Sequence, residues 1–208
     1  MKKINDLTIY DENNADFKFY NMTVYTNKDF AAKTYDAFAE KVHDMEHAMS
    51  KIVLSHEKNK DQFKEGEIPD KIQIETCRFF FGNEEFFESK FYLLENKQGE
   101  PISFIICSHE NNKDHWHVEL AYTDKSRAGE GFGGMLLELV ARDLQKENVK
   151  YLTATVDKEN GISLNMLENF GRENNIRTFR GGDSSRYGFE FDISKINELK
   201  VKDDGFGK

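Results

Sequence analysis

The feature that most constrains the fold is a glycine cluster that separates a strand-like run from a helix-like run. The apolar run is residues 116–123, and the glycines are Gly129, Gly131, Gly133 and Gly134. Glycine lets a backbone approach a phosphate without a Cβ in the way. A helix N-terminus adds outward N–H groups and about half a positive charge. The cluster therefore predicts an anion site, with a simple flexible turn as the alternative.

The residues before this cluster predict a strand and then a long helix. Residues 17–25 are rich in aromatic and β-branched side chains, which is typical of a strand, and we expect it to be the first. Thr26 and Asp29 predict a helix start, with a capping oxygen and an acid three residues on. The apolar seam that follows favours one long helix, or two helices broken near Ser50. Its members are Ala31, Tyr35, Phe38, Val42, Met45, Met49 and Ile52. The seam packs on the chain's own sheet or pairs with a second chain as a homodimer.

Short strand-like runs separated by polar turns follow a polar loop at residues 59–70. Their spacing predicts an antiparallel meander. The runs are residues 72–81, 91–94, 102–108 and 116–123.

Beyond the glycines the pattern alternates between helix and strand. Apolar positions from Phe132 to Leu144 predict a helix, residues 151–156 a strand, and residues 161–170 a second helix. Two last strands are expected at residues 176–179 and 187–193, with Gly181 and Gly182 at the turn between them. This order predicts an α/β single domain with a mixed, mostly antiparallel sheet flanked by helices.

Composition narrows the class of protein. A charged fraction of 32% beside 38% hydrophobic residues is ordinary for a soluble globular chain. The polar N-terminus and the lack of a run of about 20 apolar residues predict a cytoplasmic protein with no membrane partner. A net charge of −9 disfavours nucleic acid and is compatible with cationic substrates such as amines. Cys77 and Cys107 lie in apolar runs, which favours buried thiols over a disulfide or a nucleophile.

Other phosphate-binding motifs compete for the glycine cluster. Gly129, Gly131 and Gly134 satisfy G-x-G-x-x-G, and Asp157 could contact a ribose, so a dinucleotide or S-adenosylmethionine site is an alternative. The six residues from Thr123 to Ala128, five of them polar, separate the apolar part of the strand from the first glycine, however, where a Rossmann turn is tight. A P-loop is excluded because no Gly-Lys-Ser/Thr follows.

Two stretches in register carry a resemblance to a known family. Residues 131–137 read GFGGMLL, and a second set follows at family spacing: Asn160, Ser163, Met166, Leu167 and Gly171. The chain resembles the GNAT superfamily of acyl-CoA-dependent N-acetyltransferases, most clearly over residues 91–171. The resemblance implies one GNAT-like acyltransferase domain over residues 1–208. Residues 1–75 would form the N-terminal strand and helix on the acceptor side, residues 91–171 the acyl-CoA core, and residues 172–208 a closing hairpin and tail.

The resemblance implies direct transfer of an acetyl group from acetyl-CoA to an amine on a small molecule or a protein. Backbone donors near the glycines would hold the pyrophosphate, an N–H near Tyr122 or Thr123 would stabilise the oxyanion, and Asn160 would orient the pantetheine arm. The implied cofactor-binding residues are Tyr122, Thr123, Ala128, Gly129, Glu130, Gly131, Phe132, Gly133, Gly134, Asn160 and Ser163.

Two positions depart from the family pattern. Ala128 stands where the family has Arg or Gln, so Arg127, Lys125 or backbone donors would have to hold the pyrophosphate. Leu167 stands where the family has a tyrosine that protonates the departing thiolate, so water or Tyr122 would supply that proton. The alternative is a non-catalytic acyl-CoA-binding or interaction protein on the same fold.

The strand before the glycines carries the candidate base. Alternation places Trp116, Val118, Leu120 and Tyr122 on one face, and His115, His117, Glu119 and Ala121 on the other. The resemblance puts Glu119 at the position of the base, and we expect His117 to assist it. A solvated polar face is the alternative.

The sequence also contains three weaker patterns. A metal site formed by His115, His117 and Glu119, with His109 nearby, is less favoured, and we expect no metal. The H-x-x-E-H run at residues 43–47 is better explained by ordinary exposed residues. Six phenylalanines are most simply core, or they line an acceptor or acyl pocket: Phe79, Phe80, Phe81, Phe86, Phe87 and Phe91.

Overall fold

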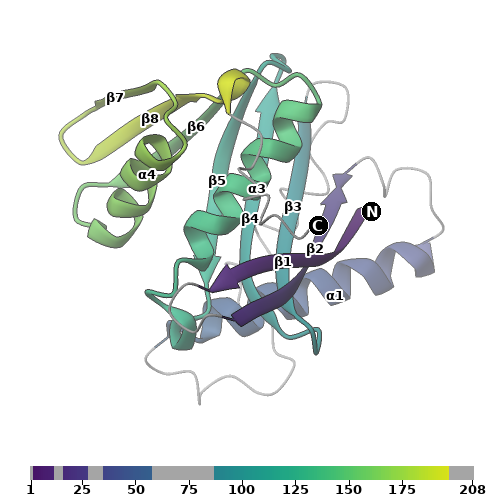
Figure 1. Ribbon diagram of the computed structural model, residues 1–208. Helices are drawn as coiled ribbons and strands as arrows, with labels where there is room; N and C mark the ends of the chain where they lie inside the picture. Colours follow the sequence, from purple (N-terminus) through teal and green to yellow (C-terminus); the bar gives the residue numbers. More distant parts are fainter. Residues whose placement is uncertain (1, 12–15, 28–34, 58–86, 197–208) are drawn as a thin grey trace, which may run out of the picture.

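The computed structural model describes residues 2–11, 16–27, 35–57 and 87–196, in which eight strands form one sheet (Figure 1). The strands are β1 (Lys2–Asp11), β2 (Asp16–Thr26), β3 (Phe87–Asn96), β4 (Pro101–Glu110), β5 (His115–Thr123), β6 (Tyr151–Asp157), β7 (Thr178–Gly182) and β8 (Arg186–Asp192). The helices are α1 (Tyr35–Leu54), α3 (Phe132–Lys146) and α4 (Gly161–Glu173), with single 3-10 turns η3 (Lys125–Arg127) and η4 (Ile193–Lys195). No described helix has the length and apolar character needed to span a bilayer.

The sheet is mixed and mostly antiparallel, as predicted. Its order is β1-β2-β3-β4-β5-β6-β8-β7. Only the β5–β6 pair is parallel, while the meander through β3, β4 and β5 and the closing β7–β8 hairpin are antiparallel. The fold class expected from the order of elements is therefore confirmed.

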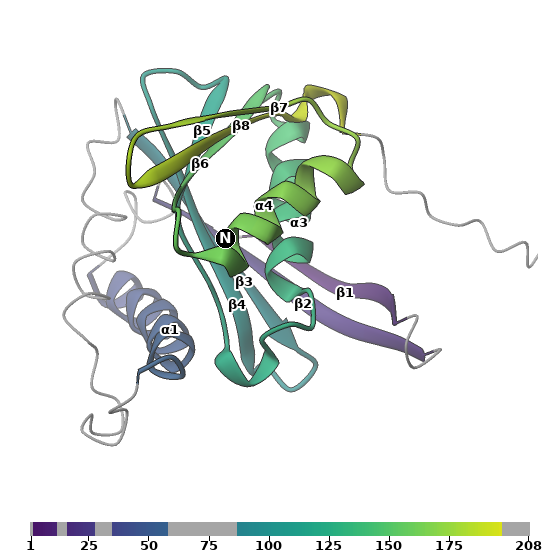
Figure 2. The ribbon, with the colours of Figure 1, turned by 90° about the vertical axis from the view of Figure 1, so that its left-hand side faces the viewer.

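Helices cover both faces of the sheet (Figure 2). On one face α3 and α4 enclose the larger core cluster, which includes Leu136, Leu152 and Phe191. On the other face α1 encloses a second cluster with Met49 and Phe104. We call these the α3 side and the α1 side of the sheet.

Helix α1 follows from its apolar seam. Met45, Met49 and Ile52 are each 0% exposed against the sheet, as the alternative of packing on the chain's own sheet predicts. Of the two alternatives, one long helix or two helices broken near Ser50, the first holds over the described residues, because α1 runs without interruption to Leu54 and buries Ser50 in its last turns. At the expected helix start, Thr26 ends β2 instead. The other predicted start residue, position 29, lies outside the described residues.

Some boundaries differ from the predictions. Residues 17–25 do form a strand, but β1 precedes it and pairs antiparallel with it. The turn expected at Gly181 and Gly182 lies instead at residues 183–185, because the Asp183 carboxylate accepts the N–H of Ser185 at 2.7 Å and of Arg186 at 2.8 Å. The last two strands therefore run at residues 178–182 and 186–192 rather than 176–179 and 187–193.

Several predictions fall outside the described residues: the loop at 59–70, the strand at 72–81, Cys77, Phe79, Phe80, Phe81 and Phe86. Phe87 opens β3. Phe91 is 0% exposed beside Phe104, so this ring is core.

Candidate functional site

The site is built around a gap in the sheet. Strands β5 and β6 pair in parallel only from His115↔Tyr151 to Val118↔Ala154. Beyond that point β5 continues to Thr123 and β6 to Asp157, and these two segments do not pair with each other. The edge of β5 over residues 119–123 therefore turns backbone N–H and C=O groups toward a space between two strands.

A β-bulge at Glu119 divides the strand beside this gap. Cys107 pairs with Val118 and Ile106 with Leu120, so Glu119 is the extra residue on β5. A bulge of this kind reverses the alternation that follows it. Trp116 and Val118 thus face the α3 side, while Leu120 and Tyr122 pack on the α1 side.

The predicted faces of β5 are therefore wrong at two points. Leu120 and Tyr122 do not share the face of Trp116, and Ala121, which pairs with Ile105 of the α3-side core, does not share the face of His117 and Glu119. The sequence of β5 alone follows simple alternation, and only its pairing with β4 shows the extra residue.

The two predicted catalytic residues lie on the α1 side and are each held by a hydroxyl. The Glu119 Oε1 atom accepts a hydrogen bond from Ser108 Oγ at 2.6 Å. His117 Nδ1 lies 2.8 Å from Thr153 Oγ1, which donates its own proton to the Trp116 carbonyl at 3.2 Å. Since that hydroxyl has one proton, Nδ1–H of His117 donates to it, and neutral His117 carries its lone pair on Nε2.

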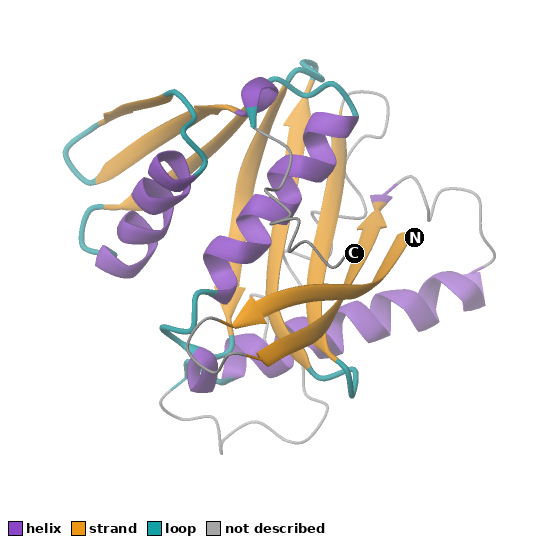
Figure 3. Cartoon of the chain, viewed as in Figure 1, coloured by secondary structure: helices purple, strands orange, loops and turns teal. Residues whose placement is uncertain are grey.

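The glycine loop joins the gap to the N-terminus of α3, where Figure 3 draws the connection in teal. Gly129 and Gly131 have φ of +87° and +83°, in the left-handed region that favours glycine. Gly131 is the N-cap of α3 and makes no capping side-chain hydrogen bond. Because the first N–H groups of a helix have no partner within it, this end of α3 presents donors for an anion.

Close packing ties the loop to both neighbouring elements. A Cβ built on Gly133 would lie 3.0 Å from Met166 Sδ in α4 and 3.2 Å from Thr123 Oγ1 in β5. A larger residue at Gly133 would therefore require the side chains of Met166 and Thr123 to move aside.

The cation expected to replace the missing family arginine is already paired. Arg127 Nε and Nη2 each donate to the Glu130 carboxylate at 2.9 Å, and the guanidinium lies 4.7 Å from the Phe132 ring centroid. The hydrogen bonds to Glu130 raise the pKa of Arg127. Ala128 is exposed and extended. In the loop backbone the N–H groups of Ala128 and Glu130 already donate to the carbonyls of Lys125 and Arg127, at 3.2 and 3.3 Å. The donors left for an anion are the N–H groups at the start of α3 and the exposed Lys125 ammonium.

The α4 residues of the second motif have structural roles. Asn160 caps α4, and its Oδ1 accepts the N–H of Ser163 at 3.1 Å. Leu167 is 3% exposed and belongs to the α3-side core, so no proton donor lies at this position. Gly171 is required, because an added Cβ would lie 2.3 Å from Thr178 Oγ1.

Sequence reasoning missed the contacts that the turn after α1 makes with the site. His56 Nε2–H donates to the Thr123 carbonyl at 2.6 Å, and its ring lies 5.7 Å from that of Tyr122. Ser55 Oγ accepts the N–H of Lys125 at 2.8 Å. His56 follows the apolar seam by one helical turn, but no pattern in the sequence links it to a residue 67 positions away.

The other candidate residues have ordinary surroundings. His115 stacks on Tyr151 at 4.5 Å, and His43 and His47 are exposed on α1. No cluster of three or more His, Cys, Asp or Glu suited to a metal occurs within the described ranges. Cys107 is free and buried, as expected, and burial, with the Glu119 charge second, raises the pKa of its thiol.

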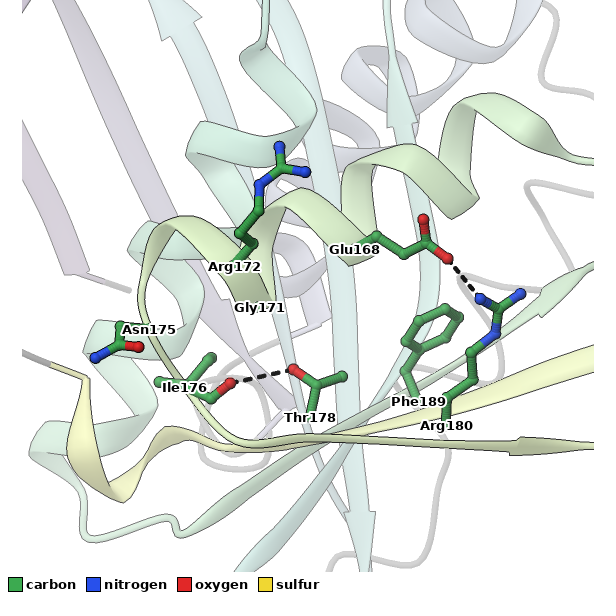
Figure 4. Close-up of a pocket in the computed structure, with 8 residues that line it drawn as sticks. All are labelled: Glu168, Gly171, Arg172, Asn175, Ile176, Thr178, Arg180 and Phe189. Carbon is green, nitrogen blue, oxygen red and sulfur yellow. Dashed lines mark hydrogen bonds and ion pairs between the residues drawn. The ribbon is translucent and has the colours of Figure 1, made fainter.

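A separate hollow of about 470 Å³ lies between α4 and β7 (Figure 4). Its lining residues are Glu168, Gly171, Arg172, Asn175, Ile176, Thr178, Arg180 and Phe189. Arg180 Nη1 pairs with Glu168 Oε1 at 2.6 Å, and Arg172 donates to Asn169. The charged side chains that line this hollow therefore already have protein partners.

Comparison with known proteins identifies the family to which this chain belongs. The model of the acetyltransferase (GNAT) family matches residues 54–171, more than half of the chain. The chain belongs to the GNAT acetyltransferase family. Its sheet is antiparallel from β1 to β5, so the doubly wound parallel sheet of a dinucleotide-binding protein is not what the described residues form.

Solved structures support the GNAT fold. A spermidine N-acetyltransferase chimera from Vibrio cholerae matches with a TM-score of 0.52 and 13% identity, over 84% of this chain and 97% of that one. The ribosomal-protein-S18-alanine N-acetyltransferase from Escherichia coli matches with a TM-score of 0.50 and 14% identity, over 86% and 97%. The chain spans 65% of the length of a nourseothricin acetyltransferase, with 50% of this chain covered, 15% identity and a TM-score of 0.42. No curated protein matches the sequence.

Proposed function

We propose that this GNAT protein transfers an acetyl group from acetyl-CoA directly to an amine, within one acyltransferase domain over residues 1–208. The observation that carries the proposal is the parting of β5 and β6 after Val118 and Ala154, next to the uncapped N-terminus of α3. The N-terminus of α3 would offer N–H donors to a pyrophosphate, and the gap between β5 and β6 would admit the narrow thioester arm.

The cofactor would be held mainly by the backbone. N–H groups of Gly129 and of residues 131–134 at the start of α3 would receive the pyrophosphate of acetyl-CoA, with Ala128 and Glu130 bordering it. An N–H at Tyr122 or Thr123 would stabilise the oxyanion of the tetrahedral intermediate. Asn160 and Ser163 lie at the start of α4, where they would border the pantetheine arm.

The acceptor would approach from the α1 side. Glu119, or His117 through its Nε2 atom, would take the proton that the ammonium must lose before its nitrogen attacks the thioester carbonyl. The new C–N bond forms, the C–S bond breaks, and the CoA thiolate leaves. Because Leu167 is buried in the core, water or the Tyr122 hydroxyl would protonate that thiolate.

Calorimetric titration with acetyl-CoA, and with NADH and S-adenosylmethionine as parallel controls, tests the cofactor. We expect saturable binding of acetyl-CoA alone. Binding of either control in its place would remove the acyltransferase assignment and the role of Glu119 with it. Release of free CoA thiol in the presence of an amine then tests transfer.

A second function is favoured by two observations. Arg127 is occupied by Glu130, and Leu167 offers no proton donor. A non-catalytic acyl-CoA-binding protein would bind acetyl-CoA in the titration and release no thiol with any amine in a panel of small amines and peptide N-termini. A cytoplasmic location and a homodimer remain predictions from the sequence.

A further inference from the structure

A second hollow, of about 490 Å³, lies on the α1 side of the sheet beside the gap. Its lining residues are His117, Thr153, Ala154, Thr155, Phe179, Gly181, Gly188, Phe189 and Glu190. Four of these stand in one row across four strands, since His117 pairs with Thr153, Thr153 with Glu190, and Glu190 with Phe179. We call this set the β5–β7 row.

The neighbouring row contains two glycines. Thr155 pairs with Gly188, and Gly188 with Gly181. Neither glycine has a positive φ, and a Cβ built on either would meet no atom within 4 Å. By contrast, a Cβ on Gly182 would lie 2.2 Å from the Arg186 carbonyl oxygen.

Glycine weakens a strand interior because it adds backbone entropy and packs no side chain. Backbone conformation and packing therefore do not account for Gly181 and Gly188. Because neither residue has a side chain, a ligand could approach the backbone of β7 and β8 closely here, which is one reason that glycine occurs within strands.

The rim of the hollow carries the carboxylate of Glu190. Glu190 is half-buried, and among the described residues its carboxylate has no ion pair or side-chain hydrogen bond. This carboxylate is partly open to solvent and is available to pair with a cation that enters the hollow. The hydroxyls of Thr153 and Thr155 add acceptors on the same face.

Phe179 supplies an apolar wall. It is 45% exposed, and among the described residues it is one of two large hydrophobic residues that are exposed. The Arg177 guanidinium lies 4.3 Å from its ring centroid, so this ring already has a cation partner. We therefore assign Phe179 to packing on a methylene chain rather than to binding an ammonium.

We propose that the hollow binds the remote ammonium of a short aliphatic diamine or polyamine, with Glu190 as its anchor. The inference rests on the proposed function and names the acceptor class for that site. Strands lie about 4.8 Å apart, so Glu190 on β8 is roughly 10 Å from β5. A diamine with one nitrogen in the gap would reach the Glu190 carboxylate with its other nitrogen, and its methylene chain would pass over Gly181 and Gly188.

The test compares binding of 1,4-diaminobutane with that of butylamine, which has the same carbon chain and one ammonium. Both are titrated calorimetrically into the whole chain saturated with CoA. We expect the diamine to bind at least tenfold tighter, the value of one hydrogen-bonded charge. Glu190→Gln should reduce this ratio to near one. Glu173→Gln removes a charge of the same sign from the exposed end of α4 and should leave the ratio intact.

A variant that adds a side chain at Gly188 gives an independent test. Gly188→Val should retain the thermal unfolding temperature, since its Cβ meets nothing, and should weaken diamine binding by a similar factor. Equal affinities of the two amines for the unchanged protein, or a ratio that survives Glu190→Gln, overturns the inference. These measurements need no turnover. Absence of thiol release with either amine would contradict the transfer function alone.

Discussion

A buried charge cluster fixes the C-terminal half of α3 to the sheet, and Asp143→Ala should unfold the protein at a markedly lower temperature. Lys90 on β3 is 2% exposed, and its Nζ lies 3.6 Å from Asp143 Oδ2. The Tyr92 hydroxyl donates to the same Oδ2 atom at 3.1 Å. Glu147, at the end of α3, also pairs with Lys90. Removing the Asp143 carboxylate leaves a buried ammonium and a buried hydroxyl without their shared acceptor.

The expected loss follows from burial. Breaking a buried ion pair by removing one partner costs about 3–5 kcal/mol. Lys90 keeps Glu147, whose side chain is 48% exposed, so we expect the lower end, about 3 kcal/mol. At about 2–4 °C per kcal/mol for a chain of this size, the unfolding temperature should fall by roughly 6–12 °C. Thermal and urea unfolding followed by circular dichroism measure both quantities.

Two further variants isolate the cause. Asp114→Ala removes the carboxylate of an exposed pair whose oxygen lies 2.6 Å from Lys150 Nζ, and it should not shift the unfolding temperature measurably. The double variant Lys90→Met with Asp143→Leu replaces both charges by apolar groups and should recover most of the loss. A double variant as unstable as Asp143→Ala alone would refute this reasoning, because the loss would then come from packing.

Three other outcomes are expected. Glu119→Gln should lower kcat/KM for amine acetylation about 10²- to 10⁴-fold and leave the affinity for acetyl-CoA unchanged. Ser108→Ala removes only the hydrogen-bond donor to Glu119 and should lower kcat/KM less. Turnover of Glu119→Gln that is unchanged across pH would exclude Glu119 as the base. Gly131→Ala should weaken acetyl-CoA binding in calorimetry and cost about 1–2 kcal/mol in urea unfolding, since φ is +83° there; unchanged values would argue against a left-handed N-cap. Burial raises the pKa of Tyr92 and of Cys107 above their ordinary values of 10.0 and 9.0, so the native state keeps protons that the unfolded chain releases. Stability should thus be complete below about pH 9 and fall as pH rises further, with a shallower fall in Cys107→Ala.

Much of the fold was predictable because its elements carry strong local patterns. The apolar seam of α1, the meander from β3 to β5 and the glycine start of α3 are each encoded within a short stretch. Strand β1 was missed because its apolar residues alternate irregularly with Lys, Asn and Asp, and its strand form depends on pairing with β2. The turn after β7 was misplaced because Asp183, rather than a glycine, closes it.

The site was less predictable, because its contacts join strands that are distant in sequence. The glycine loop could be found from residue type alone, since few residues other than glycine adopt φ near +85°. The bulge at Glu119 depends on the register with β4 and leaves no mark in β5 itself. The partners of His117 and Thr123, which are Thr153 and His56, come from elements that only the fold brings together.

The bulge also explains how a single strand serves both sides of the sheet. Before it, Val118 packs against the α3-side core that carries the glycine loop. At and after it, Glu119 and Tyr122 lie on the α1 side of the sheet. Without the extra residue, Leu120 and Tyr122 would fall on the face of Trp116, as simple alternation predicts. The same irregularity, which simple alternation does not predict, thus brings Glu119 and Tyr122 to one side of the sheet, where the proposed direct transfer would need a base on the acceptor side.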